Sequence, residues 1–195
     1  MASPWDVPFT IEGRDTLISL EKEYREKRER FELGCTLSRL ANFFKYLGAP
    51  EGAWAFPSAA KVGAEAVEIL REFDDSRELA YALLQSVVPF EAVDSEAILK
   101  EALALAKDVD DLELQGDILY QMTRAGRAFG HTLEEALACY ERIDCKLGMA
   151  QCYTSIGFGG EPRNLDLLRK ALAIYEELGN EKAAQKVKYM LWVSE

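Results

Sequence analysis

The stretch EAVEILREFDD at residues 65–75 recurs in altered form as EALALAKDVDD at 101–111, EALACYERIDC at 135–145 and KALAIYEELGN at 170–180. The second residue of each copy is an alanine, at Ala66, Ala102, Ala136 and Ala171, so the steps between copies are 36, 34 and 35 residues. A period in this range is typical of stacked helix pairs. The repeat therefore predicts an all-α solenoid.

Each copy also carries the apolar pattern of an amphipathic helix. In the first copy the apolar residues are Ala66, Ile69, Leu70 and Phe73, at positions i, i+3, i+4 and i+7, which places them on one helical face. The small residue lets a neighbouring helix come close, and the larger residues fill the space between layers. Each copy is therefore expected to be the second helix of a pair.

A first-helix signature, a small residue with a larger apolar or aromatic residue three positions later, follows the first three copies. It occurs at Ala80 and Leu83, at Gly116 and Leu119, and at Ala150 and Tyr153, and Ala41 and Phe44 fit it before the first copy. Short polar steps separate the helices, at Asp74-Asp75, Asp110-Asp111, Asp144-Cys145 and Gly179-Asn180. Asp and Asn there can cap the next helix, and Gly or Asn can adopt left-handed dihedrals.

These signatures predict one domain over residues 1–195. We expect an N-terminal capping segment and helix at 1–29, about four helix pairs at 30–180 and a C-terminal capping helix at 181–195. Three acidic residues, Glu21, Glu23 and Glu26, each stand four positions before a basic one, which favours ion pairs on an exposed helix that reaches Arg30.

Over residues 30 to 193 the pattern resembles the tetratricopeptide repeat (TPR) family in a degenerate form. The resemblance implies a right-handed superhelix of antiparallel helix pairs. It also implies a non-enzymatic adaptor or scaffold, whose concave face is lined mainly by first helices and binds a peptide or a partner protein. The Lys, Arg and Asn set with which the family's best-known groove grips a carboxylate is absent, so an acidic C-terminal peptide is not the expected ligand.

The candidate groove residues are polar or aromatic side chains of first helices beside the small-residue signature. They are Arg77, Tyr81, Gln85, Tyr120, Gln121, Arg124, Gln151 and Thr154. The alternative is that some of them pack between helices instead of facing a partner.

The net charge of −11 is concentrated in one part of the chain. Residues 65–117 hold fifteen acidic and four basic side chains, whereas 1–64 hold nine of each and 118–195 hold ten of each. Such a field disfavours nucleic acid and anionic membranes and attracts basic proteins. A second hypothesis is therefore a small acidic chaperone or immunity-type protein that neutralises a basic partner, with a docking surface at Glu68, Glu72 and Glu101. The alternative without a partner is that these acidic side chains only keep the protein soluble.

No window approaches the ~18 apolar residues of a membrane span, and Met1 to Thr10 lacks the basic start of a signal peptide. The four cysteines form no C-x-x-C pair, which favours reduced thiols. We therefore expect a soluble, cytoplasmic protein, with no cofactor and no metal. The partner, the pathway and the oligomeric state are not encoded in any of these patterns.

The residues also offer no convincing catalytic set. The single histidine, His131, precedes Glu134 by three positions, but one such pair in that order is a weak metal motif. The glycines at 157–160 lack the Lys and Ser/Thr of a phosphate loop and follow a helix instead of a strand.

The segment 49–57 is the one loop that the sequence predicts to be long and aromatic. Its Trp54 and Phe56 could form a recognition tip, because aromatic anchors dominate interface energetics. We favour the other reading, in which both side chains fold back onto the first helices.

Overall fold

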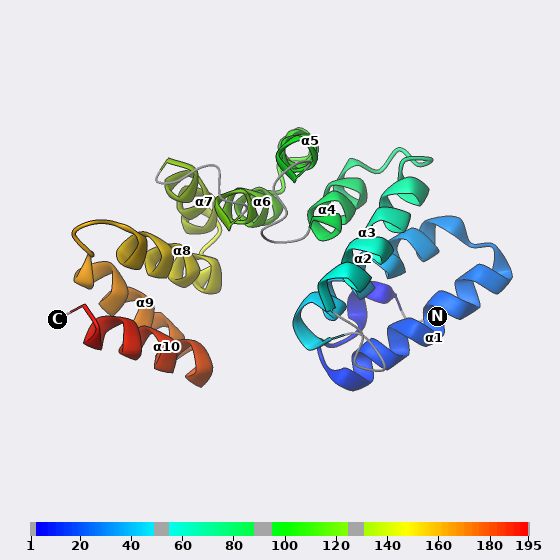
Figure 1. Cartoon of the computed structure of the whole chain (residues 1–195). Helices are drawn as coiled ribbons and strands as arrows, with labels where there is room; N and C mark the ends of the chain where they lie inside the picture. Colours follow the sequence, from blue (N-terminus) through cyan, green and yellow to red (C-terminus); the bar gives the residue numbers. More distant parts are fainter. Residues whose placement is uncertain (1–2, 49–54, 88–94, 125–130, 195) are drawn as a thin grey trace. The chain divides into compact units, whose positions relative to one another are not determined.

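The structure, a computed structural model, describes residues 3–48, 55–87, 95–124 and 131–194, with the backbone alone at 55–57. These residues form a short 3-10 helix and ten α-helices (Figure 1). Their bounds are η1 Pro4–Asp6, α1 Ile11–Lys27, α2 Arg30–Leu47, α3 Ala55–Leu70, α4 Ser76–Ser86, α5 Ser95–Asp108, α6 Leu112–Arg124, α7 His131–Arg142, α8 Lys146–Gly159, α9 Leu165–Glu177 and α10 Glu181–Trp192. The predicted all-α class is confirmed for the described residues.

The chain divides into two compact units, Met1–Asp110 and Asp111–Glu195, where the sequence analysis expected one domain over 1–195. The first unit contains η1 and α1 to α5, and the second contains α6 to α10. Inside each unit consecutive helices pack against each other, and alternate helices also touch, α2 with α4 in the first unit and α6 with α8 in the second.

The repeat alanines occupy the most tightly packed positions. Ala66, Ala102, Ala136 and Ala171 are all fully buried, in α3, α5, α7 and α9 respectively. The small residues of the first helices, Ala80, Gly116 and Ala150, are buried as well. A methyl group or a hydrogen at these sites lets helix axes approach closely, which is the packing that the sequence pattern predicted.

The polar steps between helices act as predicted. The residues Asp110, Asp144 and Gly179 have positive φ angles of 51°, 51° and 66°. Caps follow these turns or the step at 74–75: the side chains of Asp75, Asp111 and Asn180 accept hydrogen bonds from the backbone N–H groups of Glu78, Leu114 and Ala183, at 3.0, 3.0 and 3.1 Å. A left-handed residue ends one helix and a cap starts the next.

The capping helix ends earlier than the charge pattern suggested. α1 stops at Lys27, because Arg28 adopts a left-handed φ of 61°. The ion pairs Glu21–Arg25 and Glu23–Lys27 form within α1. Arg30, however, begins α2 and pairs with Glu72, so the expected pairing with Glu26 is wrong.

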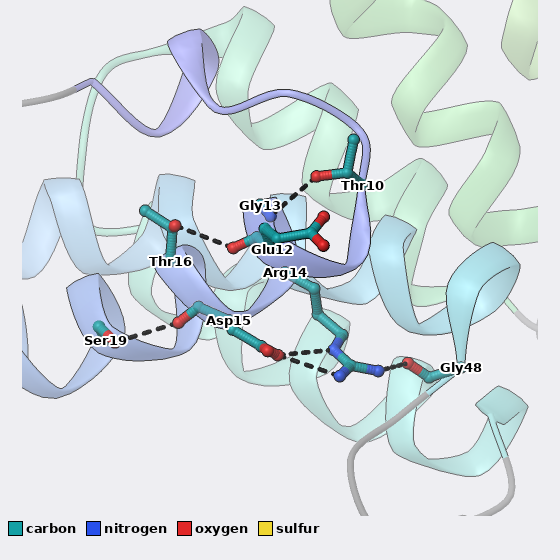
Figure 2. A network of polar contacts seen from close by, with 8 residues as sticks. All are labelled: Thr10, Glu12, Gly13, Arg14, Asp15, Thr16, Ser19 and Gly48. Atoms are coloured by element: carbon teal, nitrogen blue, oxygen red, sulfur yellow. Dashed lines mark hydrogen bonds and ion pairs between the residues drawn. The ribbon is translucent and has the colours of Figure 1, made fainter.

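The start of α1 is tied to the end of α2. The hydroxyl of Thr10 accepts a hydrogen bond from the backbone N–H of Gly13 at 3.1 Å and so caps α1. Arg14 donates to the carbonyl oxygen of Gly48 at 3.2 Å and to Asp15 (Figure 2). These bonds hold the residue that precedes α1 in place.

In the second unit one aromatic ring is held between two glycines. Tyr140 of α7 is 1% exposed. A Cβ atom at Gly116 of α6 would lie 2.7 Å from this ring, and one at Gly148 of α8 would lie 2.4 Å from it. The Tyr140 hydroxyl donates to Asp117 at 2.7 Å. The ring therefore fills the space that the two missing side chains leave.

We predict that Gly148→Ala lowers the free energy of unfolding by about 1–3 kcal/mol, because the new methyl group overpacks a ring that has no room to move. This loss exceeds the ~1 kcal/mol that alanine gains over glycine inside a helix. Urea denaturation measures the change.

The matched control is Gly160→Ala, at the end of the same helix. Its Cβ would meet no atom nearer than 3.5 Å, and its φ of −82° suits any residue. We expect a change within ~0.5 kcal/mol there. Equal effects of the two substitutions would show that the Tyr140 contact does not limit stability.

Candidate functional site

The segment before α1 lies against two first helices of the first unit. We call this segment, Ser3–Thr10, the arm. The backbone is extended at Ser3 and Val7 on either side of η1, and the side chains of Pro4 and Val7 are buried. The arm therefore has the form of a short extended peptide with a single helical turn at its centre.

Trp5 is the first anchor of the arm. Its ring meets the Tyr81 ring of α4 edge to face, with centroids 5.1 Å apart and planes at 73°. The guanidinium groups of Arg39 in α2 and Arg77 in α4 lie 4.9 and 5.8 Å from the Trp5 ring centroid. Two cations and one aromatic ring thus surround the indole, an arrangement that favours an electron-rich aromatic side chain.

Two further contacts extend the site along α2. Arg39 donates from Nη2 to the carbonyl oxygen of Val7 at 2.9 Å, a bond to the backbone that any residue at this position could accept. Phe9 packs against Phe43 at 4.5 Å and Tyr46 at 6.4 Å between ring centroids. The site thus has two aromatic anchor points, four residues apart, with a backbone hydrogen bond between them.

Of the candidate groove residues in this unit, Arg77 and Tyr81 face the arm. Gln85 does not: it is buried, and its side-chain oxygen accepts a 3.4 Å contact from Lys45. The sequence analysis missed Arg39, because it considered only residues beside the small-residue signatures of later pairs. A usable signal was present in the arm itself, where Pro4-Trp5 and Pro8-Phe9 repeat with a four-residue step.

In the second unit hydroxyl groups gather on the corresponding first helices, α6 and α8. The hydroxyl of Tyr120 is 3.3 Å from that of Ser155. Burial raises the pKa of the Tyr175 phenol of α9, and Thr154 partly opposes this rise. The Thr154 hydroxyl donates to the Ala150 carbonyl oxygen at 2.7 Å. Side chains from three helices therefore form a polar surface with neutral donors and acceptors.

The remaining candidates in this unit separate by burial. Gln121 is 8% exposed and so packs between helices, as the alternative reading anticipated. Arg124 and Gln151 are half-buried beside Tyr120 and Thr154 in sequence and helix. Ser155 of α8 belongs to the same polar surface as Tyr120 and Thr154.

The acidic candidates are exposed or half-buried, but two of them are ion-paired within the first unit. Glu72 pairs with Arg30, and Glu101 of α5 pairs with Arg71 at 2.8 Å. Glu68 is exposed on α3. The pairs join different helices of this unit, and they reduce the negative charge that a basic partner would meet.

One carboxylate beside the arm site is buried. Glu78 of α4 is 7% exposed, and its Oε1 accepts a 3.1 Å hydrogen bond from Arg77. Its Oε2 has no hydrogen-bond partner among the described residues apart from the weak thiol donor of Cys35 nearby. Burial raises the pKa of Glu78, and Arg77 only partly opposes this.

The groups considered for catalysis do not converge. His131 pairs with Glu135 at 2.9 Å on an exposed face, and not with Glu134. Burial raises the pKa of the Cys35 thiol and raises that of Cys152 to about 12, so neither is a thiolate at neutral pH. Within the part of the chain that the structure describes, no three His, Cys, Asp or Glu side chains come together to hold a metal ion.

Two other sequence predictions, on the 49–57 loop and on membrane spans, can be compared only with the residues that the structure describes. Trp54 and the Phe56 side chain lie outside them, although α3 already begins at Ala55. None of the helices within the described ranges has both the length and the apolar character needed to cross a bilayer.

Comparison with known proteins does not assign the chain to a family. No protein-family model matches it, and no curated protein matches its sequence.

We predict that Glu78→Gln stabilises the protein at pH 7 by about 1 kcal/mol, the order of the cost of a buried polar atom without a partner. A carboxyl whose pKa is raised on folding adds stability below its unfolded pKa, here near 4.5, and loses it as the pH rises through the folded value. The advantage of the amide should therefore vanish at pH 4.

Urea denaturation at pH 4 and pH 7 checks this prediction. Glu134→Gln, on an exposed face of α7, is the control and should change little at either pH. A Glu78→Gln variant that is less stable at pH 7 would show instead that the bond to Arg77 outweighs the burial of the charge.

Proposed function

We propose that this chain is a non-enzymatic, TPR-like protein-interaction module that binds an extended peptide segment of a partner protein along its first helices. The helix order within each unit, the buried repeat alanines and the packing of consecutive helices support TPR-like helix pairs. Four cysteines without disulfides suit a reducing compartment such as the cytoplasm.

The observation that carries the proposal is the packing of the arm on α2 and α4. An extended peptide of this chain already lies on α2 and α4, and two residues predicted to line a groove, Arg77 and Tyr81, contact it. The same face therefore has the chemistry to hold a peptide. The Arg39 side chain donates a hydrogen bond to the peptide backbone, which contributes affinity, and the aromatic contacts contribute specificity.

The second unit presents its own first helices for the same purpose. Tyr120, Thr154 and Ser155 offer hydroxyl groups at a partly exposed surface, and such groups can bond to the main chain of an extended peptide. Arg124 and Gln151 add longer polar side chains on the same two helices.

The acidic alternative draws less support from the contacts. Arg30 and Arg71 already neutralise two of its three proposed docking residues. A partner that used this surface would have to compete with ion pairs inside the protein, and its binding would weaken strongly with salt.

We predict that selection from a random-peptide display library on the full-length protein enriches extended peptides. Some of these should bind the second unit and lose at least ~10-fold in affinity, measured by calorimetry, when Gln151 and Thr154 are both changed to alanine, because a factor of ten corresponds to one or two lost hydrogen bonds.

The control changes Glu134 and Glu135 to alanine, two α7 residues on an exposed face, and should leave affinity unchanged. Affinity that persists between ~0.05 and ~0.5 M salt would favour the groove over the acidic surface. The absence of any enriched peptide, or enriched peptides that are basic and fully salt-sensitive, would contradict the proposal.

A further inference from the structure

We propose that the arm is an exchangeable ligand bound in cis, and that its site accepts a partner segment with the same chemistry. That segment is an extended, neutral or acidic peptide that carries a tryptophan and a second aromatic residue four positions later. This inference rests on the proposed function, because it assumes that first-helix faces bind peptides.

The arm is only partly buried in its site. Phe9, the second anchor, keeps 47% of its surface exposed, and Asp6, Pro8 and Thr10 are exposed as well. Trp5 is only half-buried, although three side chains surround it. A segment that served only to complete a core would bury its aromatic rings, as Phe43 below it does.

The site also holds a donor that the arm leaves unused. The Arg39 Nε atom is buried and has no hydrogen-bond partner among the described residues, while Nη2 of the same guanidinium donates to Val7. A buried donor without an acceptor is costly. A partner peptide that brings a carbonyl or carboxylate oxygen to this nitrogen would therefore bind better than the arm does.

Charge defines the class of partner further. Arg39 and Arg77 both face the Trp5 ring, so two guanidinium groups lie at one anchor point, and Arg77 also pairs with Glu78 at 3.1 Å. They attract the face of an aromatic ring and nearby carboxylates and repel Lys or Arg. The arm follows this rule, since the residue after Trp5 is Asp6 and no residue from 3 to 10 is basic.

The connection to α1 allows the arm to dissociate from α2 and α4. Thr10 is held by its cap on Gly13 (Figure 2), so α1 would keep its start if residues 3–9 dissociated. The Pro8 carbonyl oxygen passes so close to α1 that a Cβ at Gly13 would lie 1.9 Å from it. Gly13→Ala should therefore displace the arm without removing any residue of the site.

The test measures whether the vacated site binds the arm in trans. A fluorescent peptide of residues 1–10 is titrated into full-length wild type, Trp5→Ala and Gly13→Ala, with anisotropy as the readout. We expect both variants to bind it at least ~10-fold more tightly than wild type, because the tethered arm competes at an effective concentration in the millimolar range.

Three controls define the site. In the Trp5→Ala background, Tyr81→Ala should abolish binding, whereas Glu134→Ala should not change it. A peptide with Trp5→Ala should not bind, and one with Asp6→Lys should bind several-fold more weakly. Circular dichroism establishes that each variant is folded, and hydrogen exchange on wild type gives an independent measurement: excess peptide should speed the exchange of the Val7 amide.

Two results would overturn the inference. The first is a folded Trp5→Ala protein that does not bind the peptide at millimolar concentration, with no change in Val7 exchange in wild type, which would make the arm a fixed part of the core. The second is a concentration-dependent wild-type dimer that Trp5→Ala abolishes, which would assign the site to a second copy. In either case, the binding of selected peptides by the second unit would test the proposed function independently of the arm.

Discussion

Close approach of helices through small residues is the constraint on which the rest of the structure depends. The repeat alanines Ala66, Ala102, Ala136 and Ala171 have no exposed surface, so each methyl group is fully enclosed by the surrounding atoms. Larger residues four positions later, such as Leu70 and Tyr140, then fill the space beside them. Because interiors are packed as densely as crystals, such a pattern leaves little choice of how the helices stack.

This packing decides which surfaces remain for binding. The second helices bury the repeat alanines, whereas the apolar residues seven positions later are exposed in three of the four copies, at Val109, Ile143 and Leu178. The first helices bury Ala80, Gly116 and Ala150. What remains on the first helices is a polar and aromatic set, with Arg77 and Tyr81 in one unit and Tyr120 and Thr154 in the other. Binding chemistry therefore lies beside the packing signature and not within it.

Charge has a different role in the acidic docking surface and in the arm site. The acidic excess of residues 65–117 includes Glu72 and Glu101, which join helices of the first unit through Arg30 and Arg71. Exposed pairs of this kind contribute little stability, about 0–1 kcal/mol each. By contrast, the half-buried Arg39 and the exposed Arg77 both face the Trp5 ring, where a cation interacts favourably with the ring face. The net charge of the chain thus says less about its partner than two arginines do.

The sequence by itself determined the helices, because their signals are local. The alanine period, the apolar stripes and the turn residues Asp110, Asp144 and Gly179 act within a few positions of the chain, and the helices and turns of the repeat appear where they were expected. The differences are outside the repeat copies, where α1 ends at Lys27 and α3 begins at Ala55. Two of the eight candidate groove residues, Arg77 and Tyr81, contact Trp5 of the arm, a segment of the same chain.

Only the tertiary structure decided that the arm lies against Arg77 and Tyr81, and which further residues contact it. Arg39 and Trp5 are 34 positions apart in the chain, and their contact depends on how η1 packs on α2, which no local pattern encodes. The same reason explains the loss of the expected Glu26–Arg30 pair, because Arg30 found Glu72 across a helix boundary. Local propensity sets which residues are helical, whereas long-range packing sets which side chains meet.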